Sequence, residues 1–460
     1  MRTPRAPKGI VHRRTRKIRL PDTSAVNHQE GWKILRVSGT PQERGFTHGF
    51  LLHEELAKTL EKFPFIVKTE MNYSYTKYLS MCRRIISPVI QRDYREFYQE
   101  IQAICDGAKH AGVVVSPDVL IAWNAMFSMY ERLHNRANKR TKSGHCSAFI
   151  ATGAATENGE VVMGHTTHSE MVSAHFFNIV MYVTPDKGVP FCMQTAAGCI
   201  ASGTDWFVTQ AGIVGCETTI SDITYRPDFE HHNAPYFCRI RQAMQYGRTL
   251  DDYASIMTKH NAGDYASSWL FGDVHSQEIM LCELGLKIVN VQRTKSGIYY
   301  GMNSAISPEL RAQETDDHEF FDTTTSSGAR NARFHELLYK KYYGKLNVKH
   351  AQRILSDHYN TKTKKQQPSA TTICVHTYDD RSDYAENYPH GCTDGKVVDA
   401  AMARRMTFLG RFGPCCGRGF RAQTFLEHHP KYQEWKGMLE DFPVRQWTRL
   451  SYEEHSKSTG

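Results

Sequence analysis

The sequence predicts a layered α+β protein, and three observations carry this prediction. Residues 31–135 place their hydrophobic side chains mainly at helical spacing, whereas short strand-like runs are dense after residue 146. Helical stretches lie between and after those runs, as in proteins whose helices pack on sheets. The 460 residues also provide ample length for a large core.

A basic arm precedes this body. Residues 1–20 carry eight of the nine net positive charges of the chain and no acidic residue, so the remainder is close to neutral. We expect residues 1–30 to be disordered, and the arm of residues 1–20 to be solvated or to touch anionic surfaces. The near-neutral body argues against a nucleic-acid-binding protein, which would show a basic face.

Residues 31–145 are predicted to form a strand followed by helices. The strand covers residues 31–37. A helix starts soon after it, because Thr40 can cap the helix, Pro41 suits the first helical position and Glu43 completes a capping box. Further helices are predicted at 66–86, 89–112 and 116–134. A polar, basic linker at residues 136–144 then separates this part from the strand-rich part.

The strand-rich part, residues 146–427, opens with a predicted β-hairpin. Its first strand covers residues 147–151, its turn residues 157–159 and its return strand residues 160–164. Further strands are predicted at 176–183, 191–195, 206–210, 212–220, 268–272, 278–284, 287–292, 299–303 and 370–376. Helices are predicted at 235–260, 327–343 and 348–358, and residues 428–460 are predicted to form a polar, peripheral tail.

The hairpin would bring a thiol, an imidazole and a hydroxyl to one strand end, from Cys146, His165 and Thr167. A thiol with a pKa of about 8.5 is mostly protonated at neutral pH and needs a base to act as a nucleophile. The α-amino group of a chain terminus, with a pKa of about 7.7–8.0, can be that base. Cleavage between His145 and Cys146 would therefore put nucleophile and base on one residue. The alternative is a buried free cysteine on a strand.

Several motifs carry a resemblance to a known family, and they occur in one order along most of the chain. They are residues 44–49 (RGFTHG), 146–148 (CSA) with 164–167 (GHTT), 205–207 (DWF), 212–214 (GIV), 217–219 (ETT), 261–265 (NAGDY) and 390–397 (HGCTDGKV). From residue 31 to about residue 425 the chain resembles the phospholipase B-like proteins and the penicillin acyltransferase-like autoprocessing hydrolases. These are N-terminal nucleophile (Ntn) hydrolases.

The resemblance implies a fold and an activity. The fold would be a four-layer αββα sandwich, with two antiparallel sheets packed face to face between helical layers. Self-cleavage before Cys146 would give pieces of 145 and 315 residues that stay associated. The product would act on an amide or ester of a lipid or acylated amine, without a cofactor. The alternative function is a non-catalytic binding protein that keeps this fold.

The resemblance also implies site residues beyond Cys146 and His165. Residues 302–304 and 327–334 are similar to segments of the bile-salt and penicillin-V amidases. On that basis Asn303 would be the oxyanion asparagine, and Arg330 would lie beside the nucleophile. Thr167, Thr218 and Asn261 are expected to support the site.

The chain departs from the family pattern in its acidic active-site residue. It lacks the aspartate that the amidases place two strands from the nucleophile, so His165 or Thr167 would have to do that work. Glu217 has no obvious mate in the sequence, so a mechanism with two carboxylates has no support. His168 and His145 also replace residues that are otherwise Trp and a small residue.

Neither a metal site nor a membrane span is expected. The twelve cysteines show no repeated C-x-x-C spacing, and the pair Cys415 and Cys416 has no assigned role. His165 and His168 have ligand-like spacing, but no partnering acids or cysteines stand out. No apolar run suits a signal peptide or a transmembrane helix, although the resemblance suggests a lysosomal or secreted setting.

Overall fold

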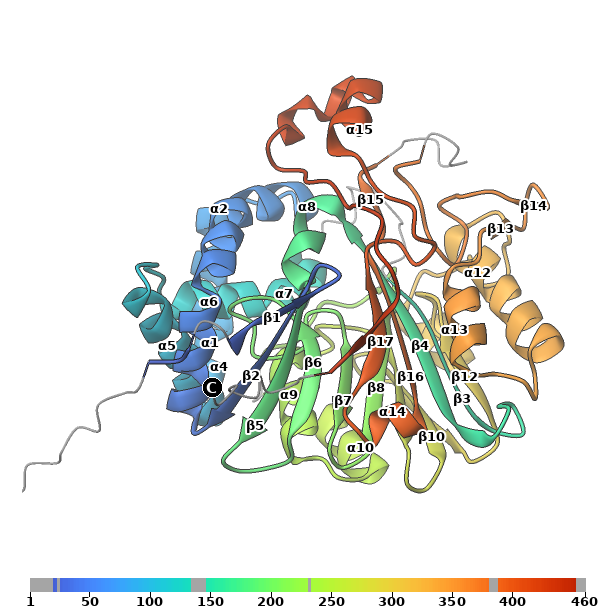
Figure 1. Cartoon of the computed structure of the whole chain (residues 1–460), viewed down its shortest axis with the longest axis horizontal. Helices are drawn as coiled ribbons and strands as arrows, with labels where there is room; N and C mark the ends of the chain where they lie inside the picture. The colour runs from blue at the N-terminus through green and yellow to red at the C-terminus, as the bar shows by residue number, and fades with distance from the viewer. Residues whose placement is uncertain (1–19, 23–24, 134–145, 231–232, 380–387, 452–460) are drawn as a thin grey trace, which may run out of the picture.

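The computed structural model describes residues 20–22, 25–133, 146–230, 233–379 and 388–451. The basic arm up to residue 19, the predicted linker of residues 136–144 and His145 lie outside the described residues. Two large sheets form the centre of the molecule, with helices on either side of them (Figure 1). No helix among the described residues is long and apolar enough to cross a bilayer.

The first sheet has nine strands, in the order β1-β2-β5-β6-β7-β8-β9-β10-β11. In that order they cover Asn27–Gln29, Trp32–Gly39, Ile179–Pro185, Phe191–Thr195, Trp206–Thr209, Ile213–Thr219, Ser267–Asp273, Glu278–Leu284 and Val289–Thr294. Neighbouring strands run antiparallel, except that β2 and β5 run parallel. Because β2 belongs to the mostly helical first part of the chain, the two parts share one sheet.

The second sheet has the strand order β12-β3-β4-β16-β17-β18, and β15 also pairs with β4. These strands cover Gly297–Gly301, Cys146–Gly153, Gly159–Glu170, Asp394–Asp399, Phe408–Phe412, Thr448–Leu450 and, for β15, His390–Cys392. The predicted hairpin is confirmed as β3 and β4. A separate two-stranded ribbon joins β13 (Tyr359–Asn360) to β14 (Lys365–Gln366).

Alternating side chains along β7 show how the first sheet is covered on both faces. Trp206 points toward the second sheet, where its ring lies 5.6 Å from that of Phe408 on β17. Its neighbour Phe207 points the other way and stacks on Tyr253 of α10 (Leu250–Thr258) at 5.8 Å. Successive residues of a strand face opposite sides, so this strand packs against a sheet and a helix at once.

The second sheet shows the same alternation on β3. Ile150 faces the first sheet and lies against Gly272 of β9, where even a methyl group would collide with it. Phe149 faces outward and packs on Phe334 of α12 (Ser326–His335). Together with α13 (Val348–Leu355), α12 buries the outer face of this sheet.

The first part of the chain supplies seven helices among the described residues: α1 Pro41–Leu51, α2 His53–Glu70, α3 Tyr75–Ile85, α4 Ser87–Asp93, α5 Arg95–His110, α6 Pro117–Asn124 and α7 Met126–Leu133. The predicted capping box at the start of α1 is confirmed, with Thr40 and Glu43 capping each other. Glycines let α1 and α5 approach closely, because a Cβ on Gly49 would meet the main-chain oxygen of Ile104. This contact explains why the 44–49 motif ends in a glycine, Gly49.

The remaining helices are short. They are α8 Met171–Ala174, α9 Tyr236–Tyr246, α11 Pro308–Glu314, α14 Ala400–Ala403 and α15 Ala422–His428, with 3-10 turns at His175–Phe177 and Pro430–Trp435 and a π-helical turn at Glu336–Lys341 after α12. The single helix predicted at 235–260 is therefore wrong in extent: it is α9 and α10. The chain breaks at Gly247, and Thr249 starts a new helix through a capping box with Asp252.

The strand predicted at residues 370–376 is wrong. The structure has only isolated bridges there, from Ser369 to Val375 and from His376 to Gly391. Because Ser369 pairs with Val375, the segment folds back on itself, and the Thr372 hydroxyl bonds the main-chain oxygens of Ser369 and Cys374. Side-chain hydrogen bonding to the nearby backbone has outcompeted extended pairing in a β-branched stretch.

Two expectations for the chain ends also differ from the structure. Residues 27–29, predicted to be disordered, form the edge strand β1 against β2. The tail after residue 428 is not merely peripheral, since β18 adds a strand to the second sheet and Phe442 is buried.

Candidate active site

Cys146 opens β3 and lines an internal pocket. In the register of the hairpin it stands directly opposite Thr167 of β4, which also lines the pocket. The Thr167 hydroxyl accepts a hydrogen bond from Lys396 Nζ at 2.9 Å, and buried Lys396 forms an ion pair with Asp394 at 2.8 Å. The thiol therefore faces a hydroxyl whose own proton can still be donated into the pocket.

Asn303 and Arg330 hold the main chain of Cys146. The Cys146 main-chain nitrogen donates to Asn303 Oδ1 at 3.2 Å, and Arg330 Nη1 donates to the Cys146 main-chain oxygen at 2.7 Å. Arg330 Nη2 also donates to Asn303 Oδ1 at 3.0 Å, which closes a ring of three residues. Sequence reasoning placed these two residues at the nucleophile, and the fold brings them there from 157 and 184 residues away.

The orientation of the Asn303 amide follows from its partners. Arg330 can only donate, so the atom facing it is the oxygen, and Asn303 Nδ2 donates to the Thr219 main-chain oxygen at 2.9 Å. Asn303 thus accepts from the Cys146 nitrogen and uses one of its two amide protons on the Thr219 main-chain oxygen. Its backbone is left-handed, with a φ of 76°, a conformation that asparagine tolerates better than most residues.

His165 lies behind the pocket rather than in it. Its cross-strand partner is Ala148, and its Nε2 donates to the main-chain oxygen of Glu217 at 2.9 Å between the two sheets. Burial and the nearby Lys396 hold the pKa of His165 well below its usual value. The imidazole that the sequence grouped with the thiol is therefore bonded to main chain between the sheets and does not line the pocket.

The other predicted supporting residues stand apart from the pocket. Thr218 points to the opposite face of β8 from its neighbours and packs against Gly301. Asn261 closes a turn, accepting from the Gly263 nitrogen and donating to the Gly285 main-chain oxygen. Neither residue lines the pocket that Cys146 enters.

A pair of buried acids lies close to Cys146. The Tyr265 hydroxyl is 2.9 Å from Asp205 Oδ2, 3.0 Å from Glu217 Oε2 and 3.0 Å from the Thr219 hydroxyl. Burial raises the pKa of Asp205 to about 7, and burial together with the charge of Asp205 raises that of Glu217 well above its usual value. Both carboxyl groups therefore keep their protons to higher pH than ordinary acids do.

Sequence reasoning missed the mate of Glu217, although the register contained it. β7 and β8 are antiparallel neighbours in which Trp206 pairs with Cys216, so the preceding residue Asp205 falls opposite Glu217. The short connection between two adjacent predicted strands was the signal that could have found it. The interpretation of Glu217 as a single acid is wrong.

The thiol is not activated in the described state. Burial, followed by the negative charges of Glu217 and Asp205, raises the pKa of the Cys146 thiol well above its usual value. A protonated thiol is a poor nucleophile, so reaction at this residue requires a base that takes its proton.

The pocket is mostly apolar, with acids at two places. Its apolar walls come from Met71, Trp123, Met126, Phe127, Tyr130, Phe177, Tyr236, Phe237 and Tyr265. Asp205 lies near the thiol, and Glu70 and Glu170 form a second pair. Burial raises the pKa of Glu170 to about 7. Burial, together with the charge of Glu170, raises the pKa of Glu70 well above its usual value. Buried carboxyl groups in an apolar pocket offer specific hydrogen-bonding points.

The first part of the chain holds the pocket wall that carries Asp205. His48 of α1 accepts a hydrogen bond from the Gly198 nitrogen at 2.9 Å. Asn124 of α6 accepts from the Ile200 nitrogen at 2.9 Å and donates to the Gly198 oxygen. The helices before residue 134 are therefore part of the site's framework.

Three comparisons relate this chain to known proteins. No family model matches the chain. An uncharacterized protein from Archaeoglobus fulgidus is 24% identical over 262 residues, which are 54% of this chain and 42% of that relative, so the match spans less than half of the relative's length.

Two solved structures of mutant conjugated bile acid hydrolase from Clostridium perfringens are similar to this chain at 8% identity. They align with TM-scores of 0.37 and 0.30, over 58% and 59% of this chain and 89% and 82% of theirs.

Proposed function

We propose that this chain is a cysteine hydrolase or acyltransferase of the Ntn type, activated by cleavage between His145 and Cys146. One observation carries the proposal: Cys146 lines a pocket, and its main-chain nitrogen and oxygen are bound by Asn303 and Arg330. Holding a cysteine by its own backbone is of use when its nitrogen takes part in the chemistry. His145 itself lies outside the described residues.

The activation step would be intramolecular. The Cys146 sulfur attacks the carbonyl carbon of His145, the peptide C–N bond breaks, and the acyl group moves to sulfur while the nitrogen takes up a proton. Water then cleaves the thioester, which releases the His145 carboxyl group and leaves a free thiol. Cys146 becomes the first residue of a 315-residue piece, with an α-amine at the atom that Asn303 binds.

The substrate step would reuse the same atoms. The α-amine takes the thiol proton and sulfur attacks the amide or ester carbon of the substrate, with the amine returning the proton to the leaving group. Water, or an acceptor amine in a transfer reaction, then resolves the acyl-enzyme. The Thr167 hydroxyl, oriented by Lys396, is placed to donate to the developing oxyanion.

The pocket supports an acylated amine or lipid as the substrate class. The aromatic and methionine side chains suit an acyl chain or another apolar group. Glu70 and Glu170 can accept hydrogen bonds from an amine or hydroxyl at the other end of the molecule. The face-to-face sheets between α12 and α10 likewise support the four-layer αββα arrangement of Ntn hydrolases.

A binding protein that keeps this fold is the second candidate, and the raised pKa of the Cys146 thiol favours it for the uncleaved chain. Intact mass and N-terminal sequencing under reducing conditions separate the two. Wild-type protein should yield pieces of 145 and 315 residues, and Cys146→Ala should stay intact. Cys199→Ala removes another cysteine of the same pocket and should still cleave. A wild-type chain that remains whole after prolonged incubation would exclude the proposal.

A further inference from the structure

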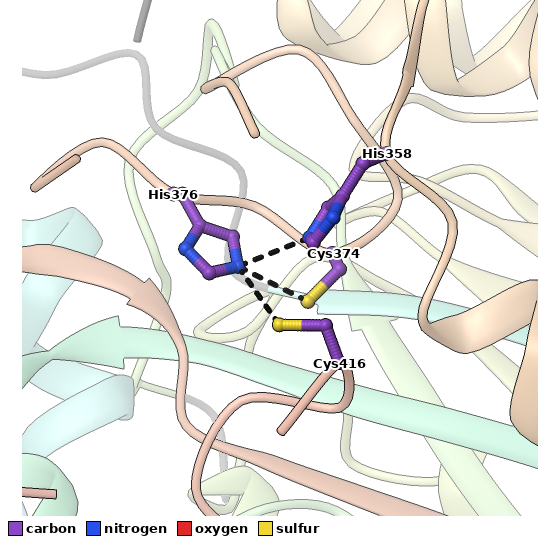
Figure 2. Close-up of side chains that lie close together, drawn as sticks. All are labelled: His358, Cys374, His376 and Cys416. Carbon is purple, nitrogen blue, oxygen red and sulfur yellow. Dashed lines mark hydrogen bonds between the residues drawn. The ribbon is translucent and has the colours of Figure 1, made fainter. Parts of the chain in front are cut away.

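A second cluster of reactive side chains lies outside the pocket. The imidazoles of His358 and His376 and the thiols of Cys374 and Cys416 point toward one another (Figure 2). One potential ligand atom from each residue lies within 4.8 Å of all the others. Cys374 and His376 are buried, whereas His358 and Cys416 are partly exposed, so the cluster is within reach of an ion from solvent.

Three separate loops supply these side chains. His358 follows α13, Cys374 and His376 belong to the folded-back segment before β15, and Cys416 lies in the loop after β17. His358 and Cys416 stand 18 and 40 residues from His376. No short spacing motif therefore announces the cluster, and the expectation that the chain has no metal site rested on such motifs.

Hydrogen bonds do not account for this geometry. His376 Nε2 lies 3.2 Å from His358 Nε2, 3.4 Å from Cys374 Sγ and 3.4 Å from Cys416 Sγ. A ring nitrogen either donates one proton or accepts one, so it can satisfy only one of three such neighbours well. Three polar atoms gathered around one nitrogen are better explained if all four share a different centre.

The distances and the donor set fit one ion. In a tetrahedral zinc site with Zn–S of about 2.3 Å and Zn–N of about 2.0–2.1 Å, ligand atoms lie roughly 3.3–3.8 Å apart. The three distances around His376 are close to this range, and small rotations would draw in the remaining atoms. We propose that His358, Cys374, His376 and Cys416 form a structural Zn²⁺ site. Four protein ligands leave no open position for catalysis.

The site would brace the wall of the pocket. Ile373, the neighbour of Cys374, accepts a hydrogen bond from His168 Nε2 at 3.1 Å, and His168 lines the pocket. On the other side of the cluster, the nitrogen of Cys415 donates to Cys392 Sγ at 3.2 Å, on the strand that pairs with β4. An ion that ties these loops together would fix the strand end that carries His168.

The wild-type protein allows a test that does not depend on any variant folding. Full-length protein, purified under reducing conditions and dialysed against a weak chelator, should retain about one zinc per chain by elemental analysis. X-ray absorption at the zinc edge should show two sulfur and two nitrogen neighbours. Zinc well below one per chain after loading with ZnCl₂, or a shell of oxygen and nitrogen alone, would overturn the proposal.

Variants then locate the ion. Cys416→Ser and His358→Ala should each lower retained zinc at least about tenfold, while Cys105→Ala, which removes a buried cysteine of α5, should leave it unchanged. Zinc content equal in all four proteins would place the metal elsewhere and contradict the assignment. So would a wild-type chain without zinc whose mass shows a disulfide between Cys374 and Cys416. None of these readouts requires hydrolase activity, so this proposal and the proposed function can fail separately.

Discussion

The main-chain nitrogen of Cys146 donates a hydrogen bond to Asn303 Oδ1 at 3.2 Å, and this contact joins the two halves of the candidate site. The amide is fixed from the other side by Arg330 and by the Thr219 main-chain oxygen. If the chain cleaves before Cys146, Asn303 therefore holds the atom that would become the α-amine.

The first prediction concerns Asn303. Asn303→Gly removes the side chain but keeps a residue that accepts the left-handed backbone. The rate of self-cleavage should fall by a factor on the order of 10²–10³, comparable to the loss of one preorganised hydrogen bond at a reacting centre. The measurement is the rate at which the 315-residue piece appears. Asn303→Ala should cleave as slowly as Asn303→Gly. Its free energy of unfolding should be about 1–2 kcal/mol lower than that of Asn303→Gly, because Ala is strained at this φ. Cleavage of Asn303→Gly at the wild-type rate would remove Asn303 from the site.

The second prediction concerns the nucleophile. Cys146→Ser should fold normally, because the two side chains are similar in size, but should lose most cleavage and turnover. A hydroxyl is a far poorer nucleophile than a thiol when the base is an amine. The measurement is the fraction cleaved over time, with hydrolysis of a panel of fatty amides and lysophospholipids by any cleaved protein. Equal rates for wild type and Cys146→Ser would assign the chemistry to another residue.

The third prediction concerns a buried ionic network that holds the first helices. Glu100 of α5 accepts from Arg44 Nε at 2.6 Å and from Arg241 Nη2 at 2.9 Å, and all three side chains are almost fully buried. Glu100→Gln leaves both guanidinium groups without this carboxylate, and loss of one partner of a buried pair costs about 3–5 kcal/mol. Denaturant unfolding should show that loss.

The matched control is Arg92→Gln, which breaks an exposed pair with Asp93 and should leave the free energy of unfolding almost unchanged. Equal stabilities of the Glu100 and Arg92 variants would mean that the network contributes little.

Local patterns predicted much of this fold, and long-range geometry accounts for what they missed. The β3–β4 hairpin follows from two short apolar runs on either side of Asn158 and Gly159, which suit a tight turn. The same hairpin correctly places Thr167 opposite Cys146. The hairpin alone does not predict the partner of His165. This residue lies two positions further along β4, between the sheets, where it bonds the Glu217 main-chain oxygen on β8.

The candidate site shows the same division. Resemblance pointed to Asn303 and Arg330, whereas Asp205 follows from strand register that sequence reasoning did not use. His376 and the three side chains around it come from three loops, and no local sequence pattern predicts that these loops meet. A β-branched run even favoured a strand where the chain folds back to present Cys374.

The fourth prediction concerns stability and pH. The pKa of Asp205 is about 7 in the folded protein, above its ordinary value of 3.8. Between these values the unfolded chain releases a proton that the folded chain keeps, so this group lowers stability as pH rises and adds no further change above pH 7. Relative to Asp205→Asn, wild-type protein should lose roughly 2–4 kcal/mol of unfolding free energy between pH 4.5 and 7.

Denaturant unfolding at several pH values measures this difference. Asparagine suits the left-handed backbone of residue 205, so the substitution changes the charge with little strain. Asp106→Asn, on the exposed face of α5, is the control and should give a curve parallel to that of wild type. Parallel curves for Asp205→Asn as well would show that Asp205 ionises as an ordinary carboxyl group.

The last prediction concerns the pH dependence of turnover by the cleaved protein. If the α-amine of Cys146 is the base, kcat/KM should rise with pH as that amine loses its proton, from an unperturbed pKa of about 7.7–8.0. The neighbouring carboxyl pair favours the ammonium form and raises this pKa, whereas burial beside Arg330 lowers it. Asp205→Asn removes one negative charge near the amine. The midpoint of its profile should therefore move to lower pH, by about 0.5–1 unit. Cys199→Ala, in the same pocket, should keep the wild-type midpoint. A midpoint that stays in place for Asp205→Asn, or moves to higher pH, would show that the base is not an amine influenced by this acid pair.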